Sequence, residues 1–173
     1  MERLSKPSKD LIKEAIKLEI NGRAFFDHAA EVTQNELGKK MFHRLAQEEA
    51  KHLETFGKLF SSIMKTDDWK KQLEKEELTG ASSVIDELSS RMKKAEGKSE
   101  IEALRIGMEL EQKAIDFFKS CSEGTEDPVA QEIFRKIADE ENFHYDLLQA
   151  QYDSVTGSGF WLDSAEFKMD SKY

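Results

Sequence analysis

Cysteine is almost absent from this sequence, which contains a single residue of that type, Cys121. One cysteine cannot form a disulfide bond within the chain, and it excludes any zinc or iron site built from four cysteines. Basic residues are also scarce relative to acids: 26 Lys and Arg stand against 35 Asp and Glu, which gives a formal charge of −9. This charge argues against binding of nucleic acid or anionic lipid through bulk electrostatics, so neither is expected as a partner.

Long apolar segments are missing as well. No run approaches the ~18 apolar residues that a membrane span needs, and the segment MERLSKPSKD shows no charged leader followed by an apolar stretch. We therefore expect a cytoplasmic protein. With 173 residues, 38% of them hydrophobic and 35% charged, the chain is long enough to form one soluble, well-buried domain.

Proline is rare too, and its two positions, Pro7 and Pro128, leave long segments free to form uninterrupted helices. No segment shows the sustained alternation, rich in β-branched residues, that is typical of strands. Apolar residues at helical spacing predict helices over about residues 9–33, 36–63, 99–123 and 128–153.

Three of these predicted helices begin with a capping signal. Asn35 is a favoured N-cap residue, and Asp127 is another, followed by Pro128 at the first helical position. Ser99 and Glu102 form the S-x-x-E pattern of a capping box. These signals support the predicted starts of the second, third and fourth helices.

The polar segment at residues 65–98 is too long for a hairpin turn. It predicts an all-α four-helix bundle, over residues 1–153, in which a long crossover joins two helix pairs. Such a crossover would also permit the exchange of helix pairs between two chains. The tail at residues 154–173 is aromatic enough to pack on the bundle or on a partner chain.

The two halves of the chain repeat at an offset of 92 residues, as 141 − 49 shows for the two Glu-x-x-His patterns. In each half a lone Glu precedes the Glu-x-x-His by 30 residues. The repeated residues are Glu19, Glu49 and His52 in the first half and Glu111, Glu141 and His144 in the second.

All six repeated residues lie on apolar helix stripes. Glu49 and His52, for example, share a face with Phe42, Leu45 and Phe56. Four carboxylates in one core must be protonated, paired with bases or bound to metal, because a buried carboxylate without a partner is costly. Two divalent cations would balance the four carboxylates and leave the neutral imidazoles as ligands.

The spacing of these residues also suits metal ligation. Residues i and i+3 share a helix face, so each Glu-x-x-His offers an oxygen and a nitrogen to one metal, and Glu49 and Glu141 can bridge two metals. This donor set suits iron or manganese, with zinc as a possible substitute. The competing interpretation, a surface pattern on Glu-rich helices, is disfavoured by the repeat. Glu48 and Glu140 also repeat but lie one position off the stripe, and we expect them to be solvated.

Four segments, LEINGRAFF, LAQEEAKH, LEQKAIDFF and IADEENFH, resemble the rubrerythrin branch of the ferritin-like superfamily, over about residues 8–153. The resemblance implies a ferritin-like four-helix bundle, usually a homodimer, with a di-iron centre that reacts with hydrogen peroxide or dioxygen. Carried over by position, it implies as ligands of the two metal ions Glu19, Glu49, His52, Glu111, Glu141 and His144.

The sequence also departs from that family. Full-length rubrerythrins carry a rubredoxin domain whose iron is held by four cysteines, and this chain lacks it, so electrons would come from a separate rubredoxin-like donor. Rubrerythrins often have an additional Glu one turn after the single Glu of the third helix, where this chain has Ala114.

We therefore expect a rubrerythrin-like di-iron oxidoreductase, a peroxidase or oxidase acting against oxidative stress, with no catalytic residue beyond the metal ligands. Two alternatives stay open: an iron-binding or ferroxidase protein for iron handling, and a non-catalytic structural bundle that contains metal.

Overall fold

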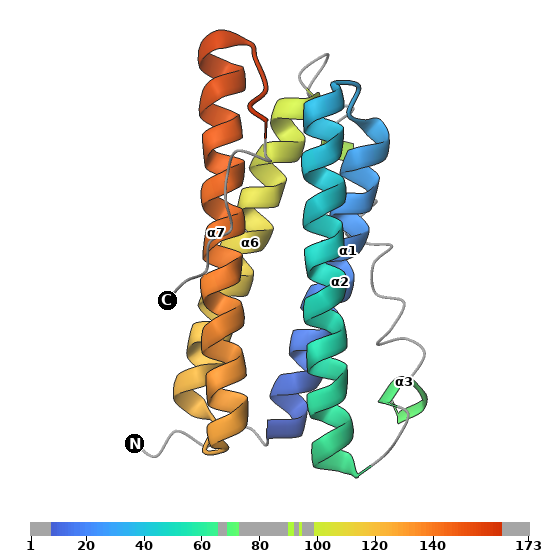
Figure 1. Cartoon of the computed structure of the whole chain (residues 1–173), viewed down its shortest axis with the longest axis vertical. Helices are drawn as coiled ribbons and strands as arrows, with labels where there is room; N and C mark the ends of the chain where they lie inside the picture. The colour runs from blue at the N-terminus through green and yellow to red at the C-terminus, as the bar shows by residue number, and fades with distance from the viewer. Residues whose placement is uncertain (1–7, 66–68, 73–89, 92–93, 95–98, 164–173) are drawn as a thin grey trace.

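The computed structural model describes residues 8–65, 69–72, 90–91, 94 and 99–163. Within these ranges the secondary structure is helical and contains no strand, so the all-α prediction is confirmed. The helices that lie within the described residues are α1 (Ser8–Val32), α2 (Glu36–Met64), α3 (Trp69–Gln72), α6 (Ser99–Gly124) and α7 (Pro128–Ser158). The four long helices match the predicted segments (Figure 1).

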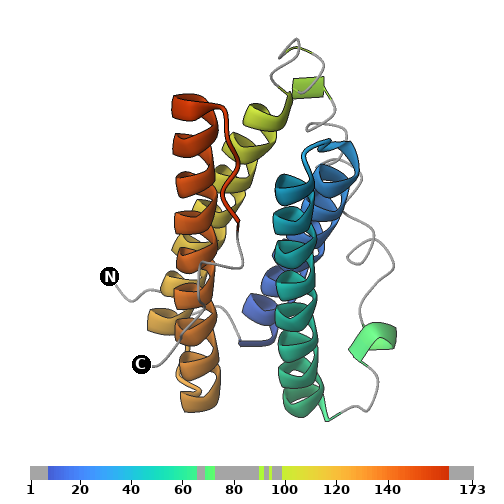
Figure 2. The same cartoon turned by 45° about the horizontal axis from the view of Figure 1, so that its top comes forward.

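The helices form two antiparallel pairs, α1 with α2 and α6 with α7, which pack side by side (Figures 1 and 2). The end of α2 and the start of α6 lie at opposite ends of the bundle, so α2 and α6 run in the same direction (Figure 1). This arrangement requires a crossover that spans the bundle, as predicted. Most of the crossover, residues 66–98, lies outside the described residues.

Two of the predicted N-caps are present. The Asn35 side chain accepts hydrogen bonds from the backbone N–H groups of Leu37 and Gly38, at 2.9 and 3.2 Å. Asp127 does the same at the start of α7. The Ser99 side chain lies outside the described set, and its predicted capping partner, Glu102, forms an ion pair with Arg91 instead.

Helix α7 continues five residues beyond its predicted end at Asp153, to Ser158. Two hydroxyl groups support the extra turn, because Thr156 and Ser158 each donate to the carbonyl oxygen four residues earlier. The helix ends where Gly159 adopts a left-handed conformation, with φ of 79°.

The core consists of two apolar clusters at different heights in the bundle. The upper cluster includes Phe25, Phe26, Met41, Phe42, Leu148 and Trp161. The lower cluster includes Ile12, Ile16, Phe56, Phe60, Phe118 and Phe134. On every long helix, the residues between the two clusters are those of the Glu and Glu-x-x-His repeat, so a polar layer lies between two apolar ones.

Two tryptophans anchor the segments outside the four helices. Trp69, on α3, is buried against α2 at Gly57, where a Cβ atom would overlap the indole ring. Trp161 packs edge-on against Phe42, with ring centroids 6.2 Å apart. The side chain of Gln151 pairs with the backbone N–H and C=O of Leu162, both at 2.8 Å. Residues 164–173 of the tail lie outside the described residues.

None of the described helices is long and apolar enough to cross a membrane.

Candidate metal centre

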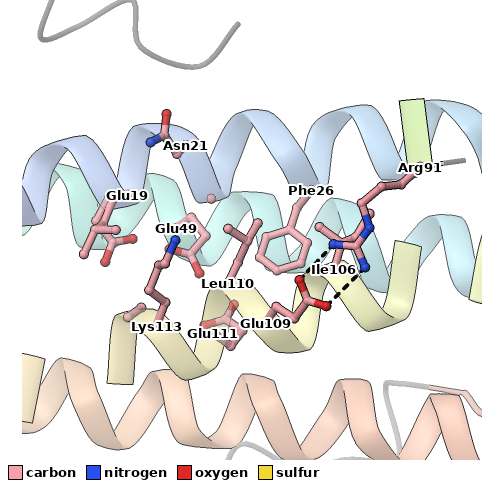
Figure 3. A pocket seen from close by; sticks show the side chains of 13 residues that line it. Glu19, Asn21, Phe26, Glu49, Arg91, Ile106, Glu109, Leu110, Glu111 and Lys113 are labelled. Atoms are coloured by element: carbon pink, nitrogen blue, oxygen red, sulfur yellow. Dashed lines mark hydrogen bonds and ion pairs between the residues drawn. The ribbon is translucent and has the colours of Figure 1, made fainter. Parts of the chain in front are cut away.

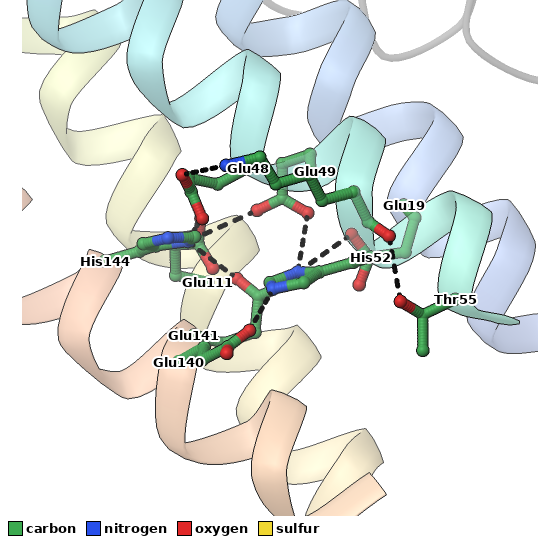
Figure 4. Close-up of polar contacts among 10 residues, drawn as sticks. Glu19, Glu48, Glu49, His52, Thr55, Glu111, Glu140, Glu141 and His144 are labelled. Atoms are coloured by element: carbon green, nitrogen blue, oxygen red, sulfur yellow. Dashed lines mark hydrogen bonds and ion pairs between the residues drawn. The ribbon is translucent and has the colours of Figure 1, made fainter. Parts of the chain in front are cut away.

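The structure brings the six repeated polar residues together in the layer between the apolar clusters (Figure 4). One residue comes from α1, two from α2, one from α6 and two from α7. All six are buried, with exposed fractions between 0 and 3%: Glu19, Glu49, His52, Glu111, Glu141 and His144.

The six residues form two overlapping groups of four potential ligands. One group is Glu19, Glu49, His52 and Glu141, and the other is Glu49, Glu111, Glu141 and His144. Within each group one oxygen or nitrogen atom per residue lies within 4.8 Å of the others. Glu49 and Glu141 belong to both groups, which is the geometry that a bridging carboxylate needs.

His52 directs its Nδ1 atom into the cluster. This nitrogen lies 2.8 Å from Glu141 Oε1, 3.6 Å from Glu19 Oε2 and 3.9 Å from Glu49 Oε2. The imidazole therefore faces carboxylates from three helices through a single ring nitrogen.

His144 repeats this arrangement from the other helix pair. Its Nδ1 atom lies 3.2 Å from Glu141 Oε2 and 3.6 Å from both Glu49 Oε1 and Glu111 Oε1. The two imidazole rings are nearly parallel, with centroids 5.8 Å apart. The pseudo-symmetry of the sequence is thus present in the geometry.

Several atoms of the cluster are buried without a hydrogen-bond partner among the described residues. They are both carboxylate oxygens of Glu19, Oε1 of Glu111 and Nε2 of His144. Buried polar atoms are nearly always satisfied, because leaving one unpaired costs about 1–3 kcal/mol. Carboxylate oxygens and imidazole nitrogens without donors fit divalent cations, so the cluster could hold metal ions.

The protonation of the metal-free cluster follows from burial and from the contacts among its members. Burial, with the charge of Glu49 nearby, raises the pKa of Glu19 well above its usual range, and burial likewise raises that of Glu111. Burial opposes ionisation of Glu141 too, but hydrogen bonds from its neighbours outweigh it, and its pKa is lowered well below normal. The pKa of Glu49 is lowered for the same reason.

Both histidines shift toward the protonated form. Burial would lower the pKa of His52, but hydrogen bonds to Glu140 and Glu141 outweigh it and raise the pKa well above normal. Burial is likewise outweighed at His144, where the contact with Glu141 raises the pKa to about 9. The raised pKa values of His52, His144, Glu19 and Glu111 all favour the protonated forms of these groups. Protons thus occupy the metal-free site where cations would otherwise balance the charge.

Glu140 is a functional candidate that the sequence analysis missed. We predicted that this residue is solvated, and that prediction is wrong. Its side chain is 27% exposed, and its Oε2 atom lies 2.6 Å from Nε2 of His52. The sequence did contain a signal, because the pair of adjacent Glu residues occurs in both halves of the repeat. We set Glu140 aside because it lies one position off the apolar stripe, but its side chain reaches a neighbouring helix. Glu48, its counterpart, forms an ion pair with Lys51 at 3.1 Å.

A cavity of about 230 Å³ leads to the cluster between α1 and α6 (Figure 3). Glu19 and Glu49 lie at one end, and the other end carries Arg91 and Glu109 (Figure 3). Apolar side chains share the lining with these charged residues and with Asn21, Glu111 and Lys113, and the apolar members include Leu18, Phe26, Ile106, Leu110 and Ala114. A small molecule can therefore reach the buried carboxylates from the protein surface.

An ion pair lies at the outer end of this cavity. The guanidinium group of Arg91 donates to both oxygens of Glu109, at 2.8 and 3.1 Å, and it also contacts Glu102. Sequence reasoning did not identify Arg91, because it lies in the polar crossover and has no spacing relation to the repeat.

The fold and the site define a class: helical bundles that bury a carboxylate–histidine cluster suited to two metal ions. The rubrerythrin family profile matches residues 10–152, so the chain belongs to the rubrerythrin family. Its structure is similar to that of Hypothetical Protein Pfu-1136390-001 from Pyrococcus furiosus, with a TM-score of 0.67 and 26% sequence identity. The similarity covers 90% of this chain and 94% of that chain. No curated protein matches the sequence.

Proposed function

We propose that this chain is a di-iron oxidoreductase that reduces hydrogen peroxide or dioxygen at the six-residue cluster. The observation that carries the proposal is a buried set of four carboxyl groups and two imidazoles, in which the residues with unpartnered carboxylate oxygens, Glu19 and Glu111, line an open cavity. In the reduced form, two Fe(II) ions would each supply one electron, so that hydrogen peroxide and two protons become two molecules of water.

The residues of the chain would hold and separate the two ions. Glu19 and His52 belong to one group of ligands, Glu111 and His144 to the other, and the two shared carboxylates would join the groups. Glu49 and Glu141, which belong to both groups, would hold the two ions together. Because the six residues are at most 3% exposed, contact of the centre with solvent is small, and small molecules would enter through the cavity.

The cavity supports a small, uncharged substrate. Its lining combines apolar side chains with charged ones of both signs, and the cation of Arg91 at the rim is already paired with Glu109 and Glu102. Ala114 lines the cavity close to Glu111, so no additional carboxylate occupies this space. Hydrogen peroxide and dioxygen are small and neutral at pH 7, and the cavity has ample room for either.

The electrons would come from a separate, rubredoxin-like protein. The chain has no second cysteine to build an internal iron–sulfur centre, and Cys121 is buried. A homodimer is also part of the proposal, and light scattering of the purified protein tests it directly.

Stopped-flow oxidation of the Fe(II)-loaded protein, by peroxide and by dioxygen in separate runs, tests the proposed activity. We expect fast oxidation by at least one of them, followed by re-reduction with a rubredoxin-type donor. Glu49→Gln should abolish stoichiometric iron binding, whereas Glu48→Gln, one position away, should retain it. Preference for dioxygen with release of ferric iron would instead favour iron handling, and a protein that binds metal without reacting would favour a structural role.

A further inference from the structure

The two halves of the cluster differ at one point. Nε2 of His52 lies 2.6 Å from Glu140 Oε2, whereas Nε2 of His144 is buried and has no hydrogen-bond partner in the described parts of the chain. Under the 92-residue repeat, the partner of His144 would be Glu48, which is bonded to Lys51 instead (Figure 4). One imidazole is therefore supported by a carboxylate behind its ring, and the other is not.

The two halves of the repeat differ in sequence at one position that accounts for the different hydrogen bonding of the two imidazoles. Glu48 has a lysine three residues later, Lys51, on the same helix face. The corresponding position in the second half, 51 + 92, is Phe143, which offers no cation to Glu140. The basic residue four positions earlier does repeat, as Arg44 and Lys136, and so does not distinguish the halves. Lys51 thus engages Glu48, while Glu140 remains available to the imidazole of the opposite helix pair.

The geometry also decides how each imidazole would bind metal. In both histidines Nδ1 faces three of the four carboxyl groups, and Nε2 points away from them. When Nδ1 of His52 binds an ion, the Nε2–H group can donate to Glu140, which fixes the ring orientation and increases the electron density at Nδ1. Carboxylate partners of this kind typically change metal affinity by about 10- to 100-fold.

We propose that the two metal positions are unequal and that the position served by His52 fills first. Glu140 acts as the positioning residue of that position, and Lys51 prevents Glu48 from serving His144 in the same way. This inference rests on the proposed dimetal centre, but it concerns the order and strength of metal binding rather than the reaction with peroxide.

Titration of the metal-free protein with Co(II) under anaerobic conditions tests the inference. Absorption of bound Co(II) and calorimetry should resolve two binding steps, with affinities separated by about 10- to 100-fold. Glu140→Ala should weaken the tighter step by a similar factor, and Glu140→Gln, which retains an acceptor oxygen, should weaken it less. The matched control is Glu48→Ala, which removes the equivalent carboxylate from the other half and should leave both steps unchanged.

A second variant tests the assigned role of Lys51. Lys51→Met removes the cation that holds Glu48, so the weaker step should tighten toward the stronger one. Proton NMR of the Co(II)-loaded protein gives an independent signature. One shifted imidazole N–H signal should exchange slowly with water, and it should disappear in Glu140→Ala. Circular dichroism of each metal-free variant establishes that the bundle is folded.

The outcomes separate this inference from the proposed function. If the folded wild-type protein binds no Co(II), the dimetal centre itself is wrong. If it binds two Co(II) ions with equal affinity, or if Glu140→Ala changes neither step, the centre stands and the proposed inequality is refuted. If Lys51→Met leaves the weaker step unchanged, Lys51 is not the cause of the difference.

Discussion

Metal binding to this cluster should release protons, and the number released follows from the structure. Before metal binds, His52 and His144 hold protons on ring nitrogens that would become ligands, because contacts with carboxylates raise the pKa of both groups. Glu19 and Glu111 hold protons as well, because burial raises the pKa of each well above normal. A divalent cation can bind these atoms only after the protons have left.

Near pH 7 we expect the release of at least about two protons per pair of ions, one from each histidine. The number should rise toward about four as the pH falls, because the two carboxyl groups of raised pKa then become fully protonated. For each proton released, the overall binding constant becomes about tenfold larger when the pH rises by one unit. This factor corresponds to about 1.36 kcal/mol of binding free energy. Affinity should therefore rise at least about 100-fold per pH unit below the His144 pKa of about 9.

Calorimetric titration of the metal-free protein with Zn(II), in two buffers of different ionisation enthalpy at the same pH, counts the protons directly. The difference in observed heat divided by the difference in buffer enthalpy gives the number released. Release of fewer than one proton per metal ion at pH 6 would refute the reasoning, because the imidazoles would then be neutral before binding. Glu48→Gln is the control, since it should not change the count.

The same structure makes three further predictions. The free energy of unfolding of the metal-free chain should fall by about 3 kcal/mol as the pH rises from 6.5 to about 9, because the folded state holds the His144 proton more tightly than the unfolded state. Thermal unfolding at a series of pH values measures this change. A melting temperature that stays constant with pH would contradict the prediction. Gly57→Ala should destabilise the fold by about 1–3 kcal/mol, because its Cβ would overlap Trp69. Gly124→Ala, where a Cβ meets nothing within 4 Å, is the control in the same denaturation assay. Ala114→Leu should slow oxidation of the Fe(II)-loaded protein by peroxide at unchanged iron content, by narrowing the cavity; an unchanged rate would exclude this cavity as the route of entry.

Residue spacing predicted both the helices and the six residues of the cluster. Both could be predicted because each depends on the periodicity of residues along a single helix. A helix buries the same face every three to four residues, so a Glu or His on an apolar stripe must point into the core. The 92-residue repeat then placed Glu19 and Glu111, and the two Glu-x-x-His patterns, in equivalent positions. The repeat therefore indicated which residues of different helices occupy equivalent positions, without knowledge of how the helices pack.

Contacts between helices were harder to predict, because they depend on side chains that leave their own stripe. Glu140 lies one position off the buried face of α7, yet its carboxyl group reaches His52 on α2. Arg91 comes from the crossover and meets Glu109 on α6 at the cavity rim. Neither pairing follows from the spacing of residues on one helix, so the structure was needed to find them.

The position of the cluster explains how one chain can bury six ionisable groups and still fold. The Phe-rich clusters above and below the polar layer supply apolar packing on all four helices, and the layer itself is confined to about one turn of each. Within that layer, protons held by the groups of raised pKa offset part of the carboxylate charge. We therefore expect the chain to fold without metal and metal binding to exchange protons for cations in a site that is already assembled. The energetic difference between the two metal positions then rests on groups at the edge of the layer, where Glu140 supports one imidazole and Lys51 holds Glu48 away from the other.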